Sequence, residues 1–493
     1  MILLSIVNAH CRIASNKLLD IPEFTLRIGE HWCVLGGNGA GKSLLSSLVQ
    51  GQLTLGAAAV HYQAEFSAHN DIIVVSFEEQ QKLWAMDNRH DISEFSENAQ
   101  DQGTTVKQLI LGNLKADARY ADILRSLALD ELEERGIRYL SSGQCRKAML
   151  ARALFQRPKL LILDEPLESI DRTSQDHIVD ALKQWMGPQT CTLLLCRRAR
   201  DILPNISHLA LMHGLRILQQ GPIADVQSTG LYTQLTQRRA QVPESLPNVD
   251  ISSAHPVFDP KVALLELKHV NAGYHGRLVL EDVSWTMRYG QHTLIEGPNG
   301  CGKSTLLSLI NGENHMAYGQ QVYLFGRLRG TGETVWDVKA RFGVVSNEIH
   351  NRYVKGWRVL DVVVSGFFDS VGLYDDSSAS QHQVARAWLR ALGIDSLSKE
   401  YYHALSFGQQ RLVLLARAMV KQPSILILDE ACVGLDDEYR ELILALTDLI
   451  ANSQRTHIIF VSHTAGEVPS CINQVIRFEG KQLVVSDAID QQT

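Results

Sequence analysis

The sequence predicts an α/β protein in which one kind of domain is built twice. Three unlike motifs occur in the same order in both halves of the 493-residue chain. GGNGAGKS at 36–43 returns as GPNGCGKS at 297–304, LSSGQCRK at 140–147 as LSFGQQRL at 405–412, and KLLILDEP at 159–166 as SILILDEA at 424–431. The offsets of 261, 265 and 265 residues are far too long for a solenoid repeat and indicate duplication of a whole domain.

In each half the expected order is a strand, a glycine-rich loop, a helix, a variable helical stretch and a second buried strand. Short strands at 32–35 and 293–295 precede the glycine-rich loops, and apolar helices follow them. The runs at 160–163 and 426–428 are apolar at every position, as in parallel strands that are buried on both faces. Inserted helical lobes are expected at about 80–139 and about 349–404.

A proline-containing stretch marks the join between the halves. Residues 242–260, VPESLPNVDISSAHPVFDP, hold four of the chain's 13 prolines and show no sustained helical period. We therefore expect a first domain over 1–225, an extended linker over 226–260 and a second domain over 261–493.

Both glycine-rich segments fit the pattern GxxxxGK[ST], in which backbone N–H groups close around phosphate oxygens. The lysine reaches the terminal phosphates of a nucleotide, and the hydroxyl that follows it binds magnesium. The expected ATP-binding residues are Gly36, Asn38, Gly39, Gly41, Lys42 and Ser43 in the first loop, and Gly297, Asn299, Gly300, Gly302, Lys303, Ser304 and Thr305 in the second. An ordinary glycine turn is the alternative, and two matches in register argue against it.

Acidic pairs follow the two buried strands. Asp164 and Asp429 end the strands, where a carboxylate can hold magnesium through water. Glu165 and Glu430 come next and are placed to polarise an attacking water as general bases. A strand end capped by acids is the alternative, but the upstream phosphate loops favour ATP hydrolysis to ADP and phosphate. The predicted magnesium ligands are Ser43, Asp164, Ser304 and Asp429.

The sequences LSSGQ and LSFGQ, some twenty residues before each ILDE strand, resemble the signature of the ATP-binding cassette ATPases. This resemblance covers nearly the whole chain and implies a RecA-like P-loop core, an antiparallel β subdomain and an inserted helical lobe in each half. It also implies that the two cassettes pair head to tail within the chain, with each ATP between one phosphate loop and the opposite signature. The signature residues are Ser141, Gly143 and Gln144 in the first half and Ser406, Gly408 and Gln409 in the second. A signature at a helix start can direct N–H groups at the γ-phosphate.

Other elements of the family occur in the second half. By resemblance, Tyr274 stacks on adenine, His463 contacts the γ-phosphate and assists catalysis, and 434–436 form the loop that links the two sites.

The first half departs from this pattern. Arg12 and Ile13 stand where the aromatic residue is expected, and Arg197 stands where the histidine is expected, although Asp171 still marks the linking loop. Arginine donates to phosphate but cannot accept a hydrogen bond or deprotonate. We therefore expect unequal sites, with most of the hydrolysis at the site that uses Lys303.

Both halves depart at the loop that in this family carries a glutamine near the magnesium and the transmembrane partner. The aligned residues are Phe77 and Asn347, and Gln80 or Gln81 is a candidate replacement. Within the family, the segments at 324–353 and 362–376 resemble the tandem ModF proteins, named for their place beside molybdate transport genes.

Charge and composition limit the function classes. A net charge of -7 gives no overall footprint for nucleic acid, and the run Arg197, Arg198 and Arg200 is interpreted as a solvated face. Eight scattered cysteines without a CxxC pair fit a reducing cytoplasm. The N-terminus has no basic region ahead of its apolar run, unlike a signal peptide, and no stretch reaches about 18 apolar residues.

Two classes of function stay open. The first is the energising subunit of an importer, for which the resemblance suggests molybdate as the cargo, with a separate permease and a peripheral position on the inner face of the membrane. The second is a regulatory or ribosome-associated tandem ATPase without a membrane partner. A short linker with little Lys or Arg argues against strong nucleic-acid binding.

Overall fold

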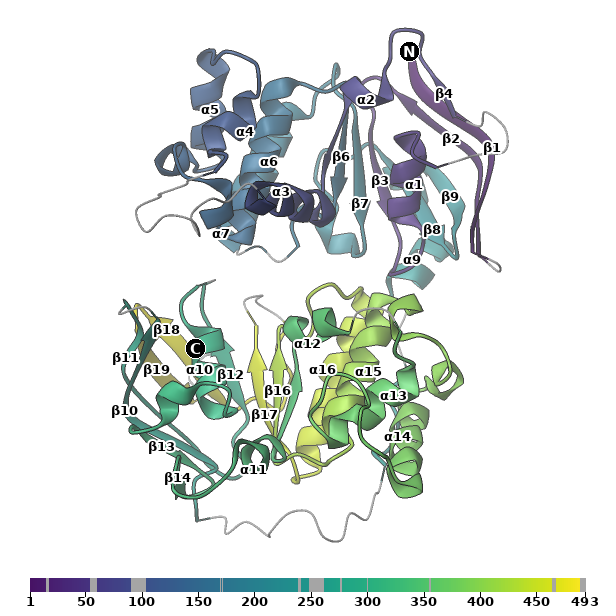
Figure 1. Cartoon of the computed structure of the whole chain (residues 1–493). Coiled ribbons are helices and arrows are strands. Elements are labelled where there is room, and N and C mark those ends of the chain that lie inside the picture. Colours follow the sequence, from purple (N-terminus) through teal and green to yellow (C-terminus); the bar gives the residue numbers. More distant parts are fainter. Residues whose placement is uncertain are drawn as a thin grey trace. The chain divides into compact units, whose positions relative to one another are not determined.

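The computed structural model describes the chain except residues 15–16, 54–59, 90–102, 169, 171, 238–240, 248–260, 275–276, 299, 354–355, 463–466 and 488–493. The chain divides into two compact units, Met1–Arg238 and Arg239–Thr493 (Figure 1). Both units are α/β domains with the predicted order of elements, so the predicted fold class is confirmed.

The first unit is built on a nine-stranded sheet of order β4-β1-β2-β9-β8-β3-β7-β6-β5. Its strands are β1 (Ile2–Ala14), β2 (Lys17–Arg27), β3 (His31–Leu35), β4 (Val60–Tyr62), β5 (Ile72–Val75), β6 (Leu160–Asp164), β7 (Thr192–Cys196), β8 (His208–His213) and β9 (Arg216–Pro222). Its helices are α1 (Lys42–Val49), α2 (Ala68–Asp71), α3 (Phe77–Arg89), α4 (Val106–Leu111), α5 (Ala118–Ser126), α6 (Ser142–Gln156), α7 (Arg172–Trp185), α8 (Ile223–Gln227) and α9 (Gly230–Thr236). Strands β1, β2 and β4 are antiparallel, whereas β8, β3, β7, β6 and β5 pair in parallel.

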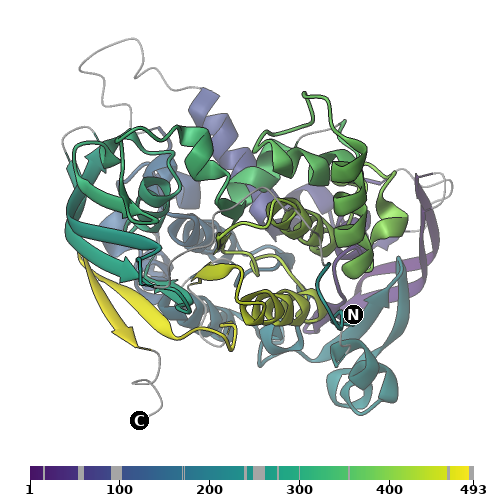
Figure 2. The same cartoon turned by 90° about the horizontal axis from the view of Figure 1, so that it is seen from below.

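The second unit has a six-stranded sheet of order β15-β16-β17-β12-β18-β19 and a four-stranded antiparallel sheet of order β11-β10-β13-β14. Its strands are β10 (Leu265–Tyr274), β11 (Arg277–Met287), β12 (Thr293–Glu296), β13 (Gln321–Leu324), β14 (Arg327–Leu328), β15 (Phe342–Val345), β16 (Ile425–Asp429), β17 (His457–Val461), β18 (Gln474–Glu479) and β19 (Gln482–Asp487). Its helices are α10 (Lys303–Ile310), α11 (Val335–Lys339), α12 (Asn347–Arg352), α13 (Val359–Val364), α14 (Ala379–Ala391), α15 (Phe407–Met419) and α16 (Asp437–Asn452). Figure 2 shows β18 and β19, in yellow, beside the antiparallel strands, and the Glu281 N–H of β11 donates to the Lys481 carbonyl at 3.0 Å.

The parallel strands follow one order in both units, β5-β6-β7-β3-β8 in the first and β15-β16-β17-β12-β18 in the second. The strand before the phosphate loop is therefore separated by a single strand from the strand that ends in the acidic pair. Because the carboxyl ends of parallel strands meet at one edge of a sheet, the loop and the acids share that edge.

The central strands are buried on both faces, as their unbroken apolar runs predict. On β6, Leu161 and Leu163 pack into one hydrophobic core, while Leu160 and Ile162 pack into another on the opposite face. In the second unit the alternating residues of β16 divide in the same way between two cores. This burial fixes the strand register, and with it the position of the acids at the strand ends.

Helical lobes lie between β5 and β6 and between β15 and β16, as predicted (Figure 1). Two of the lobe helices, α4 and α14, begin at capping boxes, in which a hydroxyl accepts the N–H three residues on and that residue's side chain caps in return. Thr105 and Gln108 form one at α4, and Ser378 and Gln381 form another at α14.

The chain after 226 differs from the expected extended linker. Helices α8 and α9 occupy much of 223–236, and Thr229 caps α9 by accepting the Tyr232 N–H. Val226, Leu231 and Leu235 pack against the core of the first unit, so tertiary burial stabilises helices too short to be stable alone.

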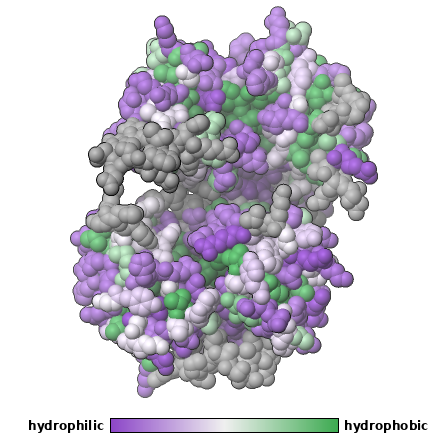
Figure 3. Space-filling model, in the orientation of Figure 1, coloured by the Kyte–Doolittle hydropathy of each residue, from purple (hydrophilic) through white to green (hydrophobic). Residues whose placement is uncertain are grey.

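Hydrophilic residues predominate on the face shown in Figure 3, with apolar residues in small groups between them. Among the residues that the structure describes, no helix has both the length and the apolar character needed to cross a bilayer.

Candidate functional site

The first phosphate-binding loop connects β3 to α1. Gly39 and Gly41 have φ values of 76° and 103°, which glycine adopts without steric cost. A Cβ atom at Gly36 would come within 2.3 Å of the Met212 carbonyl oxygen. The Lys42 ammonium group donates to the Gly36 carbonyl at 2.6 Å and so lies over the loop.

The second loop, between β12 and α10, repeats this geometry. Gly300 and Gly302 have φ values of 82° and 116°, and Lys303 donates to the Gly297 carbonyl at 2.7 Å. Each loop leads directly into a helix N-terminus, where backbone N–H groups and the helix dipole favour an anion. Both loops therefore have the backbone features of a phosphate-binding loop.

Side-chain oxygens that could bind a magnesium ion lie at the same edge of the sheet as the phosphate loops. The Ser43 hydroxyl donates to Asp164 Oδ2 at 3.0 Å, which brings together two side-chain oxygens of the kind that Mg²⁺ prefers. In the second unit Ser304 and Asp429 line one cavity of about 370 Å³. The other residues of that cavity include Gly300, Gly302, Lys303, Thr305, Asn347, Glu348 and Glu430.

The two glutamates adopt the same uncommon backbone conformation. Glu165 and Glu430 have φ values of 49° and 50°, and their N–H groups donate to the carbonyls of Leu195 and Val461 at 3.1 Å. A left-handed conformation in a non-glycine residue persists only where the surroundings enforce it, and it concentrates at functional sites. The Glu165 carboxylate lies 4.0 Å from Lys42 Nζ, and Glu430 lines the cavity of the second phosphate loop.

Burial governs the charges at this edge. Burial raises the pKa of Glu165 to about 7, although Arg197 and Lys42 act in the opposite direction. Burial, together with the neighbouring Glu430, raises the pKa of Asp429 to about 6. Carboxyl groups with perturbed pKa values that lie beside phosphate loops are typical of functional sites.

The signature residues lie at the starts of α6 and α15. The Ser141 hydroxyl accepts the Gln144 N–H, and the Gln144 side chain accepts the Ser141 N–H. Ser406 and Gln409 form the same capping box. A Cβ atom at Gly408 would come within 2.4 Å of the Tyr439 ring, so a larger residue would have to displace that ring. Gly143 is buried in α6.

The residues at the family's glutamine position, Phe77 and Asn347, have different surroundings in the two units. The Asn347 amide oxygen accepts from the Arg411 guanidinium group, and Asn347 lines the cavity with the phosphate loop. Phe77 takes the corresponding place in the first unit and is half-exposed. Gln80 is buried and accepts from Arg146 Nε at 3.3 Å, so its carbonyl is engaged with the first unit's signature helix.

Arg197 is mostly buried and lies against two carboxylates. Its Nε is 2.9 Å from Glu165 Oε1, and an Nη atom pairs with Glu168. Arg198 pairs with Asp201 at 2.7 Å. The interpretation of this run as a solvated face is therefore wrong for both arginines, because the carboxylates that pair with them offset the cost of burial.

Some predicted residues cannot be placed. Asn299, Asp171 and His463 lie outside the described residues, as do the side chains of Ile13 and Tyr274. The other residues predicted to bind ATP or magnesium, to act as base or to form the signature lie on the phosphate loop, the acidic strand end or the start of the signature helix of their unit.

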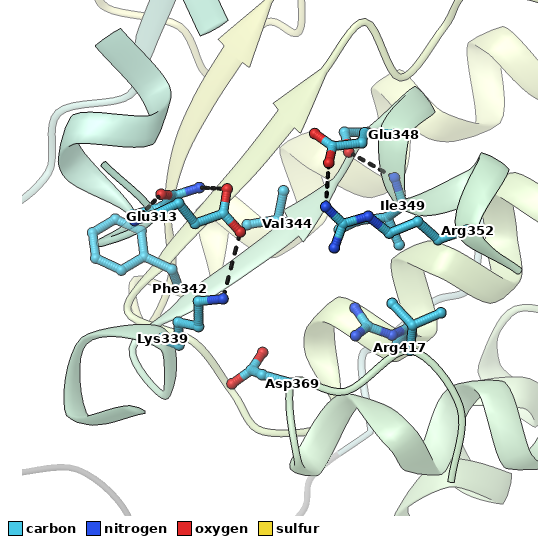
Figure 4. Close-up of a pocket in the computed structure, with 12 residues that line it drawn as sticks. Glu313, Lys339, Phe342, Val344, Glu348, Ile349, Arg352, Asp369 and Arg417 are labelled. Carbon is cyan, nitrogen blue, oxygen red and sulfur yellow. Dashed lines mark hydrogen bonds and ion pairs between the residues drawn. The ribbon is translucent and has the colours of Figure 1, made fainter. Parts of the chain in front are cut away.

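A second cavity, of about 90 Å³, lies beside the first in the second unit and shares Glu348 with it. Figure 4 shows charged side chains directed into it from α11, α12 and α15. Lys339 lies 3.5 Å from Glu313, and Arg352 pairs with Glu348. The cavity therefore offers charges of both signs next to the Asn347 loop.

Four charged residues were missed by the sequence analysis. Arg146 and Arg411 each follow the signature serine by five residues, and Arg146 donates to the Glu165 carbonyl at 3.1 Å. That equal spacing was a usable signal. Glu168 and Glu348 have no motif of their own, and only the folded chain shows their place.

A parallel sheet with a phosphate loop, an acidic strand end and a capped signature helix defines each unit as a P-loop nucleotide-hydrolysing domain. The ABC transporter family model matches residues 19–168 and 280–433, and the chain belongs to this family. It is an ATPase that binds ATP through two ATP-binding cassettes in tandem.

The curated relatives include tandem proteins of nearly the same length. The chain is 34% identical to the ABC transporter ATP-binding protein ModF of Escherichia coli, over 96% of both chains. It is 26% identical to an uncharacterized ABC transporter ATP-binding protein of Schizosaccharomyces pombe, over 94% of this chain and 95% of that one. The expected resemblance to the ModF proteins is thus confirmed.

Solved structures share the fold at low identity. An archaeal ribosome recycling factor, solved with a ribosomal stalk protein, aligns with a TM-score of 0.57 at 16% identity, over 98% of this chain and 90% of that one. The RNase-L inhibitor aligns with a TM-score of 0.58 at 16% identity, over 98% and 91%.

Proposed function

We propose that the two cassettes pair head to tail, so that each ATP is held between one phosphate loop and the opposite signature. The observation that carries this proposal is that both units hold a phosphate loop, an acidic strand end and a capped signature. Lys42 and Lys303 would hold the terminal phosphates, facing Ser406 and Ser141 respectively.

The hydrolytic step in this proposal uses the two glutamates. Glu430 or Glu165 accepts a proton from the attacking water. At the same time the water oxygen bonds to the γ-phosphorus, and the bond between that phosphorus and ADP breaks. Ser43 with Asp164, and Ser304 with Asp429, are the residues that would hold Mg²⁺. When bound, that ion neutralises charge on the phosphates.

The function that the site supports best is the energising subunit of an importer, bound to a separate permease at the cytoplasmic face of the membrane. The support is the charged cavity beside the Asn347 loop, where the family resemblance places contact with the transmembrane partner. Molybdate is the first cargo to test, because the relative with 34% identity is a ModF protein.

Co-purification from solubilised membranes tests this role. A polytopic protein should accompany the full-length chain and should be lost from Arg352→Glu, which reverses a charge at the cavity. Arg390→Glu, on the exposed face of α14, is the matched control and should retain the partner. Purification without any polytopic protein, with ATPase activity intact, would contradict the importer role.

A tandem ATPase without a membrane partner is the second candidate. Phe77 favours it, since an aromatic side chain replaces the glutamine that couples family members to permeases. Sedimentation with ribosomes distinguishes a ribosome-associated ATPase from a regulatory ATPase. Retention through about 0.5 M salt would identify a ribosomal factor, because non-specific charge contacts weaken steeply with salt.

A further inference from the structure

Arg197 and His463 stand at the same sequence distance from the strand residue that accepts the N–H of their unit's glutamate. In the first unit the Glu165 N–H donates to Leu195, two residues before Arg197. In the second unit the Glu430 N–H donates to Val461, two residues before His463. The first unit thus has an arginine, and the second unit a histidine, two residues after the carbonyl that accepts the glutamate N–H.

The Arg197 guanidinium group bridges two carboxylates. Nε lies 2.9 Å from Glu165 Oε1, and an Nη atom pairs with Glu168. Arg197 and Glu165 are each only 13% exposed, which limits competition from water. The same Glu165 oxygen lies 4.0 Å from Lys42 Nζ, so the side chains of Arg197 and Lys42 both lie close to one carboxylate oxygen.

Glu168 makes this arrangement specific to the first unit. It follows Glu165 by three residues, whereas the residue three positions after Glu430 is Val433. Valine offers no second carboxylate for a cation at this place. The first unit therefore combines Arg197 with Glu168, whereas the second unit has His463 and Val433 at the corresponding sequence positions.

We propose that Arg197 and Glu168 form a clamp that holds Glu165 as an ion pair, so that the first unit's site retains ATP and hydrolyses it slowly. This rests on the proposed role of Glu165 as general base. Hydrolysis needs a carboxylate oxygen to accept the water proton as the new P–O bond forms and the bond to ADP breaks. The Glu165 oxygen that faces Arg197 and Lys42 is already engaged by these two cations, and the bridge from Arg197 to Glu168 holds the carboxylate in that position. Arginine itself cannot accept the proton.

The test measures single-turnover ATP hydrolysis in full-length protein carrying Glu430→Gln, which silences the other base. Adding Arg197→His and Glu168→Val, the residues of the second unit, should raise the first site's rate constant at least about tenfold. The nucleotide that stays bound after gel filtration should change from ATP to ADP. Arg198→His in the same background is the matched control, because Arg198 pairs with Asp201 instead.

Binding of a fluorescent ATP analogue and the melting temperature identify variants that have merely lost the fold. Arg197→Lys, which keeps a cation without the two-sided fork, supplies a conservative replacement and should raise the rate by less than the histidine variant does. An unchanged rate in a folded, ATP-binding Arg197→His/Glu168→Val protein would overturn the clamp. An increase that survives a further Glu165→Gln would also overturn it, since the released base would then not be Glu165. Loss of the increase on Glu165→Gln supports both the clamp and the base.

Discussion

Glu165 and Glu430 share one left-handed backbone conformation, with φ values of 49° and 50°, although 265 residues separate them. Each donates its N–H to the neighbouring strand, which fixes the turn that the carboxylate leaves from. Both halves of the duplication have therefore kept a strained strand end of the kind that costs about 1–3 kcal/mol. Retention of that strain in two places fits a shared catalytic duty, whereas the surroundings of the two carboxylates have diverged.

Removing the base of the second unit should separate binding from chemistry. Glu430→Gln should bind ATP with near-normal affinity and turn over at least about tenfold more slowly, because the phosphate contacts remain while the proton acceptor is lost. Steady-state phosphate release and equilibrium ATP binding measure the two effects. The matched control, Glu441→Gln on the exposed face of α16, should leave both unchanged. Near wild-type turnover in Glu430→Gln would rule out this role.

The two phosphate-loop lysines should contribute unequally. Lys303→Ala should remove most of the steady-state ATPase activity, while Lys42→Ala should leave a substantial fraction, because Glu165 is held by Arg197 whereas Glu430 has Val433 three positions on. Both variants remove the same ammonium contact to their own loop, so each serves as the other's control. Equal losses would show that the two sites turn over as one cooperative unit.

Acid should weaken the second unit through His292. Its Nδ1 accepts the Ile458 N–H at 3.1 Å, which requires an unprotonated nitrogen. Burial and the adjacent His457 lower the pKa of His292 from 6.5 to about 4. Between these two values the unfolded chain binds more protons than the folded one, so the free energy of unfolding falls as the pH drops from 6.5 to 4.

The expected loss is about 1–2 kcal/mol, less than the full shift implies because the ring is partly exposed to solvent. Denaturant unfolding at several pH values measures it. His292→Asn should flatten this part of the profile, and the exposed His315→Asn should not. Parallel profiles for His292→Asn and the wild-type protein would contradict the assignment.

The buried strand β16 of the second unit should be sensitive to cavity formation. Leu428 on β16 is fully buried, and Leu428→Ala should lower the free energy of unfolding by about 2–5 kcal/mol. Val484→Ala, on the exposed surface of β19, should change it by less than about 0.5 kcal/mol. Chemical denaturation followed by far-UV circular dichroism compares the two, and a small loss at Leu428 would mean that the core relaxes into the space.

The phosphate loops, acidic strand ends and signature helices were predictable because each is a short motif with local backbone requirements. The glycine φ values at Gly41 and Gly302 and the capping residues follow directly from residue type and spacing. The parallel strands were equally predictable, since burial on both faces leaves an unbroken apolar run.

Contacts that depend on tertiary packing were not predictable. The burial of Gln80 against Arg146 joins α3 to α6, and nothing in either segment announces it. Arg197 looked like part of a charged surface because Glu168, which lies 29 residues earlier, carries no motif of its own. Helices α8 and α9 are too short to be recognised by periodicity and form because the first unit's core covers their apolar residues.

The capping boxes at the two signatures have a consequence for the entropy of nucleotide binding. The Ser141 hydroxyl oxygen accepts from the Gln144 N–H, so its hydrogen remains able to donate, and the Gln144 NH₂ group keeps its donors because only the amide oxygen is engaged. Ser406 and Gln409 are arranged alike. The rotamers of these serine and glutamine side chains are already fixed when the helix forms. The conformational entropy lost in fixing them is therefore part of the cost of folding and not of each nucleotide-binding event.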